Sequence, residues 1–172
     1  MRLVTIASKK AVLVGAAILA ISAGFIPTIA INALADTVIC RATNPCEGTA
    51  EEDNIVGTDG ANTISGFGGD DNIIAKGGDD TVFGGGGEDT IDGGDGKDRL
   101  DGGAHDDLLI GGSGNDRLIG RGGNDDLISG PGNDTLTGGP GADSFDCGDG
   151  TDTVTDFNRA EGDTAQANCE TI

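Results

Sequence analysis

The chain has no tryptophan and no tyrosine, only 3% aromatic residues and a single histidine among its 172 residues. With so few large side chains, the thick core of an ordinary globular domain is hard to build. Basic residues are scarce too: 10 Lys and Arg against 30 Asp and Glu give a formal net charge of −20. This charge excludes a general affinity for nucleic acid and favours cations as partners. Such a composition is typical of disorder unless an internal repeat organises the chain.

The first 35 residues have the order of an export signal. A positive start is followed by the uncharged apolar stretch 11–31 and by the small residues Ala33-Leu34-Ala35. This order predicts a secretory signal peptide over residues 1–35. Its removal would leave 7 basic and 30 acidic residues, a net charge of −23, in an extracellular protein. The alternative is an uncleaved anchor that keeps the protein at the cell surface, because the apolar stretch is long enough to span a bilayer.

Beyond this segment the sequence repeats every nine residues. One column is apolar in all twelve units: Ile55, Ile64, Ile73, Val82, Ile91, Leu100, Leu109, Leu118, Leu127, Leu136, Phe145 and Val154. Two residues before each stands an aspartate, or once an asparagine: Asp53, Asn62, Asp71, Asp80, Asp89, Asp98, Asp107, Asp116, Asp125, Asp134, Asp143 and Asp152. A third column, two residues earlier, is glycine except at Glu51 and His105. Three columns in constant phase indicate one structural unit repeated along the chain.

Each unit has room for a glycine-rich loop and one short strand. Glycine at fixed offsets marks backbone that needs a positive φ or lies close to another chain segment. If the chain reverses at every loop, two repeats complete one coil, and each strand pairs with the strand two repeats away. Side chains alternate across a strand, so the apolar column points inward from both sheets. Twelve repeats then predict an all-β parallel β-roll of about six coils.

The unit reads G-G-x-G-x-D-x-U-x, where U is a large apolar residue, and Gly111–Ile119 shows it in full. Over residues 48–157 the chain resembles the haemolysin-type calcium-binding family of repeats in toxin (RTX). The resemblance implies a right-handed parallel β-roll in which each Ca²⁺ bridges two loops on the same side. It also implies that aspartate carboxylates and loop carbonyls bind the ions. Members of the family often carry an enzyme domain, but here only residues 36–47 stand between the predicted signal and the array.

The chemistry of the columns also favours calcium. Stacked carboxylates repel unless a cation lies between them, and a donor set made only of oxygen suits Ca²⁺ better than Mg²⁺ or Zn²⁺. The expected ligands are Asp71, Asp80, Asp89, Asp98, Asp107, Asp116, Asp125, Asp134, Asp143 and Asp152, with carbonyls near Gly85, Gly87, Gly94, Gly96, Gly103, Gly112, Gly114, Gly123, Gly130, Gly132, Gly139 and Gly141. Two rows of six loops have at most about ten gaps for ions. We expect the chain to be disordered without calcium and to fold on binding it.

Some loops depart from the pattern, and we expect them to bind more weakly. Asn62 replaces a carboxylate with an amide, and Ala75-Lys76 replaces two loop glycines. The first loop, which ends at Asp53, is expected to be a frayed edge of the array. His105 stands where a glycine is expected, although histidine tolerates left-handed backbone better than most residues. The strongest sites are expected between Gly84 and Asp152.

The four cysteines flank the array and suit an oxidising compartment. Cys40 and Cys46 lie in the lead-in, 36–47, whereas Cys147 lies in the last loop and Cys169 in the tail, 158–172. If the repeats form a rod, cysteines at opposite ends are too far apart to be bridged. The expected disulfides are therefore Cys40–Cys46 and Cys147–Cys169, the alternative being free or intermolecular thiols. The second bridge would pin the tail over the last coil, where Phe157 is expected to cover the core.

Several other functions are weighed against calcium binding. A catalytic triad lacks its parts, because His105 is the only histidine and stands at a glycine position, so no enzyme activity is expected. The third loop column has no row of threonines, which disfavours an ice-binding surface. A structural or adhesive module at the cell surface or in a matrix stays open as an alternative. We expect a monomer or weak self-association, and the sequence names no second ligand or partner.

Overall fold

The computed structural model describes residues 36–40 and 45–169, so the predicted signal peptide lies outside the described residues. Within these ranges the chain forms short strands and no helix that is long and apolar enough to cross a membrane. The strands are β1 Asp36–Ile39, β2 Cys46–Glu47, β3 Asp53–Val56, β4 Thr63–Ser65, β5 Asn72–Ile74, β6 Thr81–Gly86, β7 Thr90–Asp95, β8 Arg99–Ala104, β9 Leu108–Ser113, β10 Arg117–Gly122, β11 Asp126–Ile128, β12 Pro131–Gly132, β13 Thr135–Thr137, β14 Ser144–Asp146, β15 Asp149–Gly150, β16 Thr153–Val154 and β17 Thr164–Ala165.

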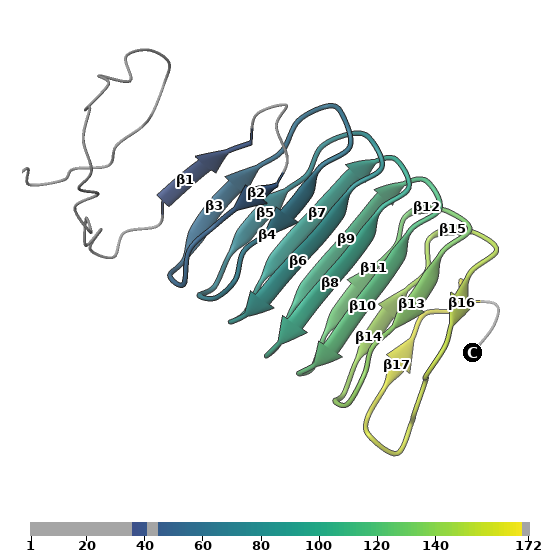
Figure 1. Ribbon diagram of the computed structural model, residues 1–172. Helices are drawn as coiled ribbons and strands as arrows, with labels where there is room; N and C mark the ends of the chain where they lie inside the picture. The colour runs from purple at the N-terminus through teal and green to yellow at the C-terminus, as the bar shows by residue number, and fades with distance from the viewer. Residues whose placement is uncertain (1–35, 41–44, 170–172) are drawn as a thin grey trace, which may run out of the picture.

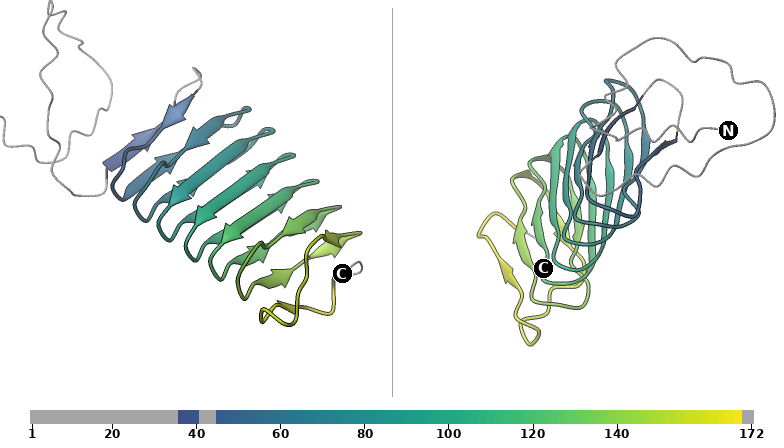
Figure 2. Two further views of the ribbon diagram at one scale, coloured as in Figure 1. Left: turned by 60° about the horizontal axis from the view of Figure 1, so that its bottom comes forward. Right: turned by 90° about the vertical axis from the view of Figure 1, so that its left-hand side faces the viewer.

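Two parallel sheets form the body of the molecule, and successive repeats alternate between them (Figure 1). The eight-stranded sheet has the order β1-β3-β5-β7-β9-β11-β14-β17, and the seven-stranded sheet has the order β16-β13-β10-β8-β6-β4-β2. Strands β12 and β15 form a small third pair within the loops. Figure 2 shows the resulting elongated stack, with the lead-in strand at one end and the tail at the other. The predicted all-β parallel β-roll is confirmed.

The core is one side chain wide for each strand. The predicted apolar column lies in register, with Ile55 beside Ile73 in one sheet and Ile64 beside Val82 in the other. All twelve members are buried, and only Val154 keeps a measurable exposure, 4%. The burial follows from strand alternation, because the residues on either side of each apolar residue must point away from the core.

The roll is about one turn longer than the six coils expected. Strands β1 and β17 extend the eight-stranded sheet beyond the repeats, and β2 extends the other sheet. Strand β1 pairs with β3 along its full length, so the first loop is not the frayed edge that we expected. The flanking segments therefore cover strand edges that would otherwise be open to association.

The two disulfides join the expected cysteines. Cys40 and Cys46 are bridged with a Cα–Cα distance of 5.4 Å, and Cys147 and Cys169 with one of 5.1 Å. All four cysteines are buried at the two ends of the apolar core. Each bridge thus ties a non-repeat segment to the end of the solenoid.

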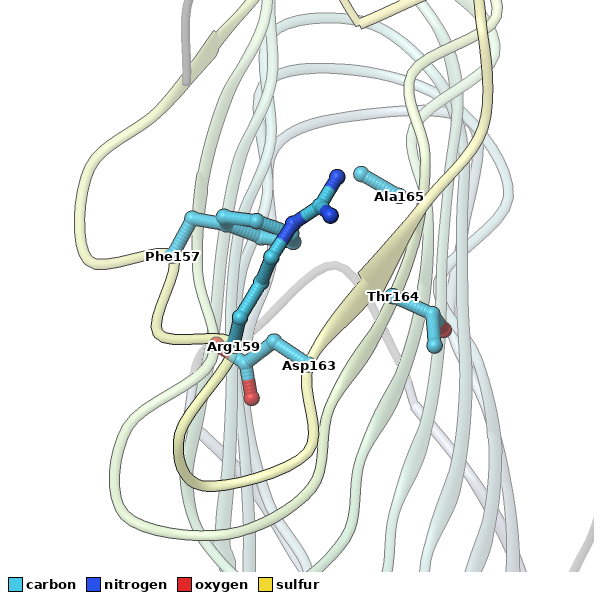
Figure 3. Close-up of a pocket in the computed structure, with 5 residues that line it drawn as sticks. All are labelled: Phe157, Arg159, Asp163, Thr164 and Ala165. Carbon is cyan, nitrogen blue, oxygen red and sulfur yellow. The ribbon is translucent and has the colours of Figure 1, made fainter.

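The tail closes the C-terminal end of the core with an aromatic contact. The ring of Phe157 lies 6.2 Å from that of Phe145, the last large residue of its sheet, which confirms the expected role of Phe157. The guanidinium of Arg159 lies over the same Phe157 ring, 5.9 Å from its centroid. Phe157 and Arg159 line a shallow cavity of about 420 Å³ together with Asp163, Thr164 and Ala165 (Figure 3).

Candidate metal centre

The aspartate column lies where each loop enters the next strand. Its side chains are buried despite their charge: Asp71 and Asp89 each expose 2%, and Asp107 exposes 3%. The other members are equally buried, namely Asp53, Asp80, Asp98, Asp116, Asp125, Asp134, Asp143 and Asp152, and so is Asn62. Charged groups at such depth require compensation by hydrogen bonds, by counter-charges or by metal ions.

One carboxylate oxygen of each aspartate from Asp71 onward accepts a hydrogen bond from the preceding coil. Asp71 Oδ1 accepts the backbone N–H of Asp53 at 2.8 Å, and Asp89 Oδ1 accepts that of Asp71 at 2.9 Å. The same contact recurs between residues 18 apart as far as Asp152. The column is therefore a ladder that joins successive coils along both edges of the roll.

The second carboxylate oxygen has no such partner. From Asp71 to Asp143, Oδ2 of every aspartate in the column is buried and accepts no hydrogen bond from the described residues. A buried anionic oxygen without a partner costs free energy, and a column of them costs it repeatedly. These oxygens are the candidate ligands of a bound cation.

A backbone carbonyl of the next coil lies beside several of these oxygens. A β-carbon built on Gly93 would lie 2.6 Å from Asp98 Oδ2 and 2.6 Å from the carbonyl oxygen of Gly111. The corresponding distances for Gly111 are 2.8 Å to Asp116 Oδ2 and 2.6 Å to the carbonyl oxygen of Ser129. Glycine at the first loop position thus leaves room for a carboxylate and a carbonyl to converge.

We expected carbonyls near twelve loop glycines to bind the metal. Most of these glycines have a left-handed backbone conformation and form tight turns. Positive φ is found at Gly85, Gly87, Gly94, Gly96, Gly103, Gly112, Gly114, Gly123, Gly130, Gly139 and Gly141, but not at Gly132. Four non-glycine residues, Phe67, Lys76, His105 and Arg121, share this backbone conformation. His105 has φ of 83°, so it does take the backbone conformation of the glycine that it replaces.

Burial raises the pKa of nine aspartates of the column, those from Asp71 to Asp143. Desolvation raises the pKa of Asp107 to about 7, and neighbouring carboxylates including Asp89 and Asp125 raise it further, against a backbone hydrogen bond that lowers it. Desolvation likewise raises the pKa to about 6 for Asp71, Asp80, Asp89, Asp116 and Asp125. It also raises the pKa of Asp98, Asp134 and Asp143. Without a cation, the folded chain therefore disfavours the ionised column.

In the first two loops, hydrogen-bond donors of the protein itself satisfy the side-chain oxygens of Asp53 and Asn62 that face the loop. Asp53 Oδ2 accepts the backbone N–H of Thr49 at 2.6 Å and its hydroxyl at 2.9 Å. Asn62 Oδ1 accepts the backbone N–H of Thr58 at 2.7 Å. The oxygens of Asp53 and Asn62 that face their own loops are thus satisfied without a metal, in keeping with the weaker binding expected there.

Sequence reasoning missed Asp163, which continues the column into the tail. Asp163 Oδ1 accepts the backbone N–H of Asp143 at 3.1 Å, and its Oδ2 accepts that of Asn158 at 2.7 Å. Ala165 pairs in register with Phe145, so the tail reproduces the aspartate and apolar positions of one more repeat. The sequence signal is the Asp-x-apolar triplet Asp163-Thr164-Ala165, which lies two residues later than the nine-residue period would place it. A search for exact nine-residue spacing therefore does not find it.

The donor set fits calcium. Each loop except that of Asn62 offers one carboxylate of the column, and the described residues contain no group of three or more His, Cys, Asp or Glu side chains that could hold a metal by themselves. The other ligands must be carbonyl oxygens, which suit hard ions such as Ca²⁺ and not Zn²⁺. The unpartnered Oδ2 atoms and the adjacent carbonyls supply such oxygens in the loops that begin at Gly84, Gly93, Gly111 and Gly120.

The chain is thus a repeat protein that forms a parallel β-solenoid, and the loops along both of its edges present oxygen atoms suited to cations. The chain belongs to the RTX calcium-binding nonapeptide repeat family, whose model (4 copies) matches residues 47–82, 74–107, 83–118, 101–136 and 119–154. Together these matches cover residues 47–154, well over half of the chain. No curated protein and no solved structure matches it.

Proposed function

We propose that this chain is a secreted calcium-binding protein whose repeats fold when Ca²⁺ binds between stacked loops. The observation that carries the proposal is the series of buried, unpartnered Oδ2 atoms from Asp71 to Asp143. Family membership supports calcium as the ion. The proposed ligands are the aspartates of the column and the loop carbonyls beside them.

The architecture explains why folding would depend on the metal. Each nine-residue repeat buries a single large apolar side chain, whereas nine residues of backbone must be ordered. The aspartate ladder joins the coils through Oδ1, but it also brings carboxylates together at neighbouring positions along each edge. Bound calcium would supply the counter-charge and a ligand for the remaining oxygens.

A calcium titration followed by circular dichroism tests the proposal. The chain secreted by cells that express the full sequence would be stripped with chelator and titrated with CaCl₂, and separately with MgCl₂. We expect a cooperative change from coil to β structure in calcium alone, reversed by chelator. A spectrum that does not respond to calcium would show that the aspartate columns are not working sites.

Secretion is tested on the same material. The proposed cleavage after Ala35 predicts an intact mass that corresponds to a chain beginning at Asp36 and containing two disulfides. A membrane-bound form that retains residues 1–35 would instead favour the cell-surface structural or adhesive module. Both outcomes leave the calcium chemistry of the repeats unchanged.

A further inference from the structure

The two edges of the roll carry different loops. Row A is the set of loops that lead into the eight-stranded sheet, and row B is the set that leads into the seven-stranded sheet. Row A contains loops 48–53, 66–71, 84–89, 102–107, 120–125 and 138–143, and row B contains loops 57–62, 75–80, 93–98, 111–116, 129–134 and 147–152. Neighbouring loops of one row are 18 residues apart and are joined by the aspartate ladder.

The first position of the loop separates the rows. In row A it is always glycine: Gly48, Gly66, Gly84, Gly102, Gly120 and Gly138. In row B it is glycine only at Gly57, Gly93 and Gly111, and the other three loops carry Ala75, Ser129 and Cys147. These three side chains are completely buried, so their β-carbons point into the structure and not into solvent.

A β-carbon at this position interferes with the oxygens that face the proposed ion. On Gly84 it would overlap Asp89 Oδ2 and lie 2.6 Å from the carbonyl oxygen of Gly102. On Gly120 it would overlap Asp125 Oδ2 and lie 2.7 Å from the carbonyl oxygen of Gly138. Real β-carbons do not approach oxygen so closely, so at least one oxygen must move where glycine is replaced.

In row B, the side chains that replace glycine also change the chemistry of the loop. Ala75 places an apolar methyl group at the position where row A has only the hydrogen atom of glycine. Ser129 donates its hydroxyl to the carbonyl oxygen of Cys147 at 2.7 Å, a side-chain hydrogen bond that glycine at this position cannot make. Cys147 is held in its disulfide with Cys169. Row B also contains Asn62, the one member of the column without a carboxylate.

Row A, in contrast, continues beyond the repeats. Asp143, the last aspartate of its loops, donates its backbone N–H to Asp163 of the tail, and the carbonyl of Asp143 accepts the N–H of Thr164 at 2.8 Å. The aspartate ladder of row A therefore passes into the tail.

We infer that calcium binds as a continuous series along row A, at the loops of Asp71, Asp89, Asp107, Asp125 and Asp143, but in row B only at the central loops of Asp98 and Asp116. The inference rests on the calcium binding proposed above and divides its sites unequally between the two edges. Row B loops that contain Ala75, Ser129 or Cys147 serve as spacers that hold the coils in register.

Ion stoichiometry of matched variants tests the division. Asp107→Asn in row A and Asp80→Asn in row B each retain an oxygen for the backbone N–H that the aspartate accepts from the preceding coil. Bound calcium would be counted by equilibrium dialysis and by native mass spectrometry of the full secreted chain. We expect Asp107→Asn to lose about one ion or more per chain, and Asp80→Asn to lose none.

A gain-of-site variant gives a second readout that does not depend on a damaged fold. Ala75→Gly removes the methyl group at the first position of the loop that ends at Asp80, and we expect it to bind about one ion more than the parent chain. Equal losses from Asp80→Asn and Asp107→Asn, or no gain from Ala75→Gly, would overturn the division between rows while leaving calcium binding intact. A parent chain that binds no calcium would instead overturn the proposed function itself.

Discussion

At the scale of single residues, the column aspartates have two tasks that depend on different oxygens. Oδ1 of Asp107 accepts the N–H of Asp89 at 2.8 Å and so joins two coils. Oδ2 of the same residue is buried without a hydrogen-bond partner among the described residues. Protonation and cation binding are the two ways in which the second oxygen can be stabilised, and they compete for it.

This competition predicts that acid partly replaces calcium. An unfolded aspartate has a pKa near 3.9, whereas burial raises the pKa to about 6 for Asp89 and to about 7 for Asp107. The folded, metal-free chain therefore binds more protons, and its stability falls as the pH rises from about 4 to about 7. In excess chelator, we expect lowering the pH from 7.5 to 5 to increase the β signal in circular dichroism reversibly.

The control is the same pH series in a subsaturating concentration of calcium. There protons compete with the ion for carboxylates, so acid should displace calcium and lower the calcium-dependent part of the stability. A metal-free chain whose folded fraction rises with pH would contradict the raised pKa values of the column.

Glycine positions offer a second residue-scale prediction. Gly112 has φ of 103°, and a β-carbon there would overlap the carbonyl oxygen of Gly94 in the preceding coil. Gly122 has no positive φ, and a β-carbon there would have no heavy atom within 4 Å. We expect Gly112→Ala to lower the free energy of unfolding in saturating calcium by about 2 kcal/mol or more, from strain and steric overlap.

Gly122→Ala is the matched control and should change the free energy of unfolding by less than about 1 kcal/mol. Both values would be measured by urea denaturation followed by circular dichroism. Equal effects would mean that the loops of neighbouring coils are not packed as closely as the structure indicates.

At the scale of elements, the repeat could be predicted almost residue by residue, whereas the added strands β1 and β17 at its two ends could not. The apolar column set the register of both sheets because every ninth residue is large and apolar, as in the pairing of Leu109 with Leu127. Strands β1 and β17 lie outside that period, so no periodic signal marks them, whereas Cys46 of β2 stands nine residues before Ile55 and pairs in register with Ile64. The hydrogen bonds of Thr49 and Asp163 depend on loop geometry that sequence spacing alone does not contain.

The disulfides give an element-scale prediction, because each holds a flanking segment on the solenoid. Cys147 and Cys169 are 22 residues apart, whereas Cys40 and Cys46 are 6 apart. Closing the longer loop removes more entropy from the unfolded chain, so replacing Cys147 and Cys169 by serine should cost about 3 kcal/mol, and replacing the other pair about 2 kcal/mol. Urea denaturation in saturating calcium would give both values.

The tail should also lose its own structure when its bridge is removed. Without the bridge, Phe157 and β17 are held by the ring contact with Phe145, by short strand pairing and by a few hydrogen bonds such as that between Asp143 and Asp163. Amide hydrogen exchange should therefore speed up around Thr164 and Ala165 in the Cys147→Ser/Cys169→Ser variant, and not around β1. Faster exchange at β1 as well would show that the two ends are not independent.

At the scale of the whole molecule, charge and shape are coupled. The chain carries a formal net charge of −20, and its buried carboxylates lie in rows along both edges of the roll. Salt screens exposed charges, but it does not supply a ligand for a buried oxygen. Specific ion binding and general screening therefore predict different behaviour for the metal-free chain.

Small-angle X-ray scattering of the secreted chain distinguishes specific ion binding from general screening. A disordered chain of the length proposed for the secreted form should have a radius of gyration of about 38 Å, and a compact one a value near about 14 Å, somewhat larger for an elongated roll. We expect millimolar CaCl₂ to cause this contraction, and about 1 M NaCl without calcium to cause only a small part of it. Full contraction in NaCl alone would mean that repulsion between exposed charges, and not the unpartnered oxygens of the aspartate columns, keeps the chain unfolded.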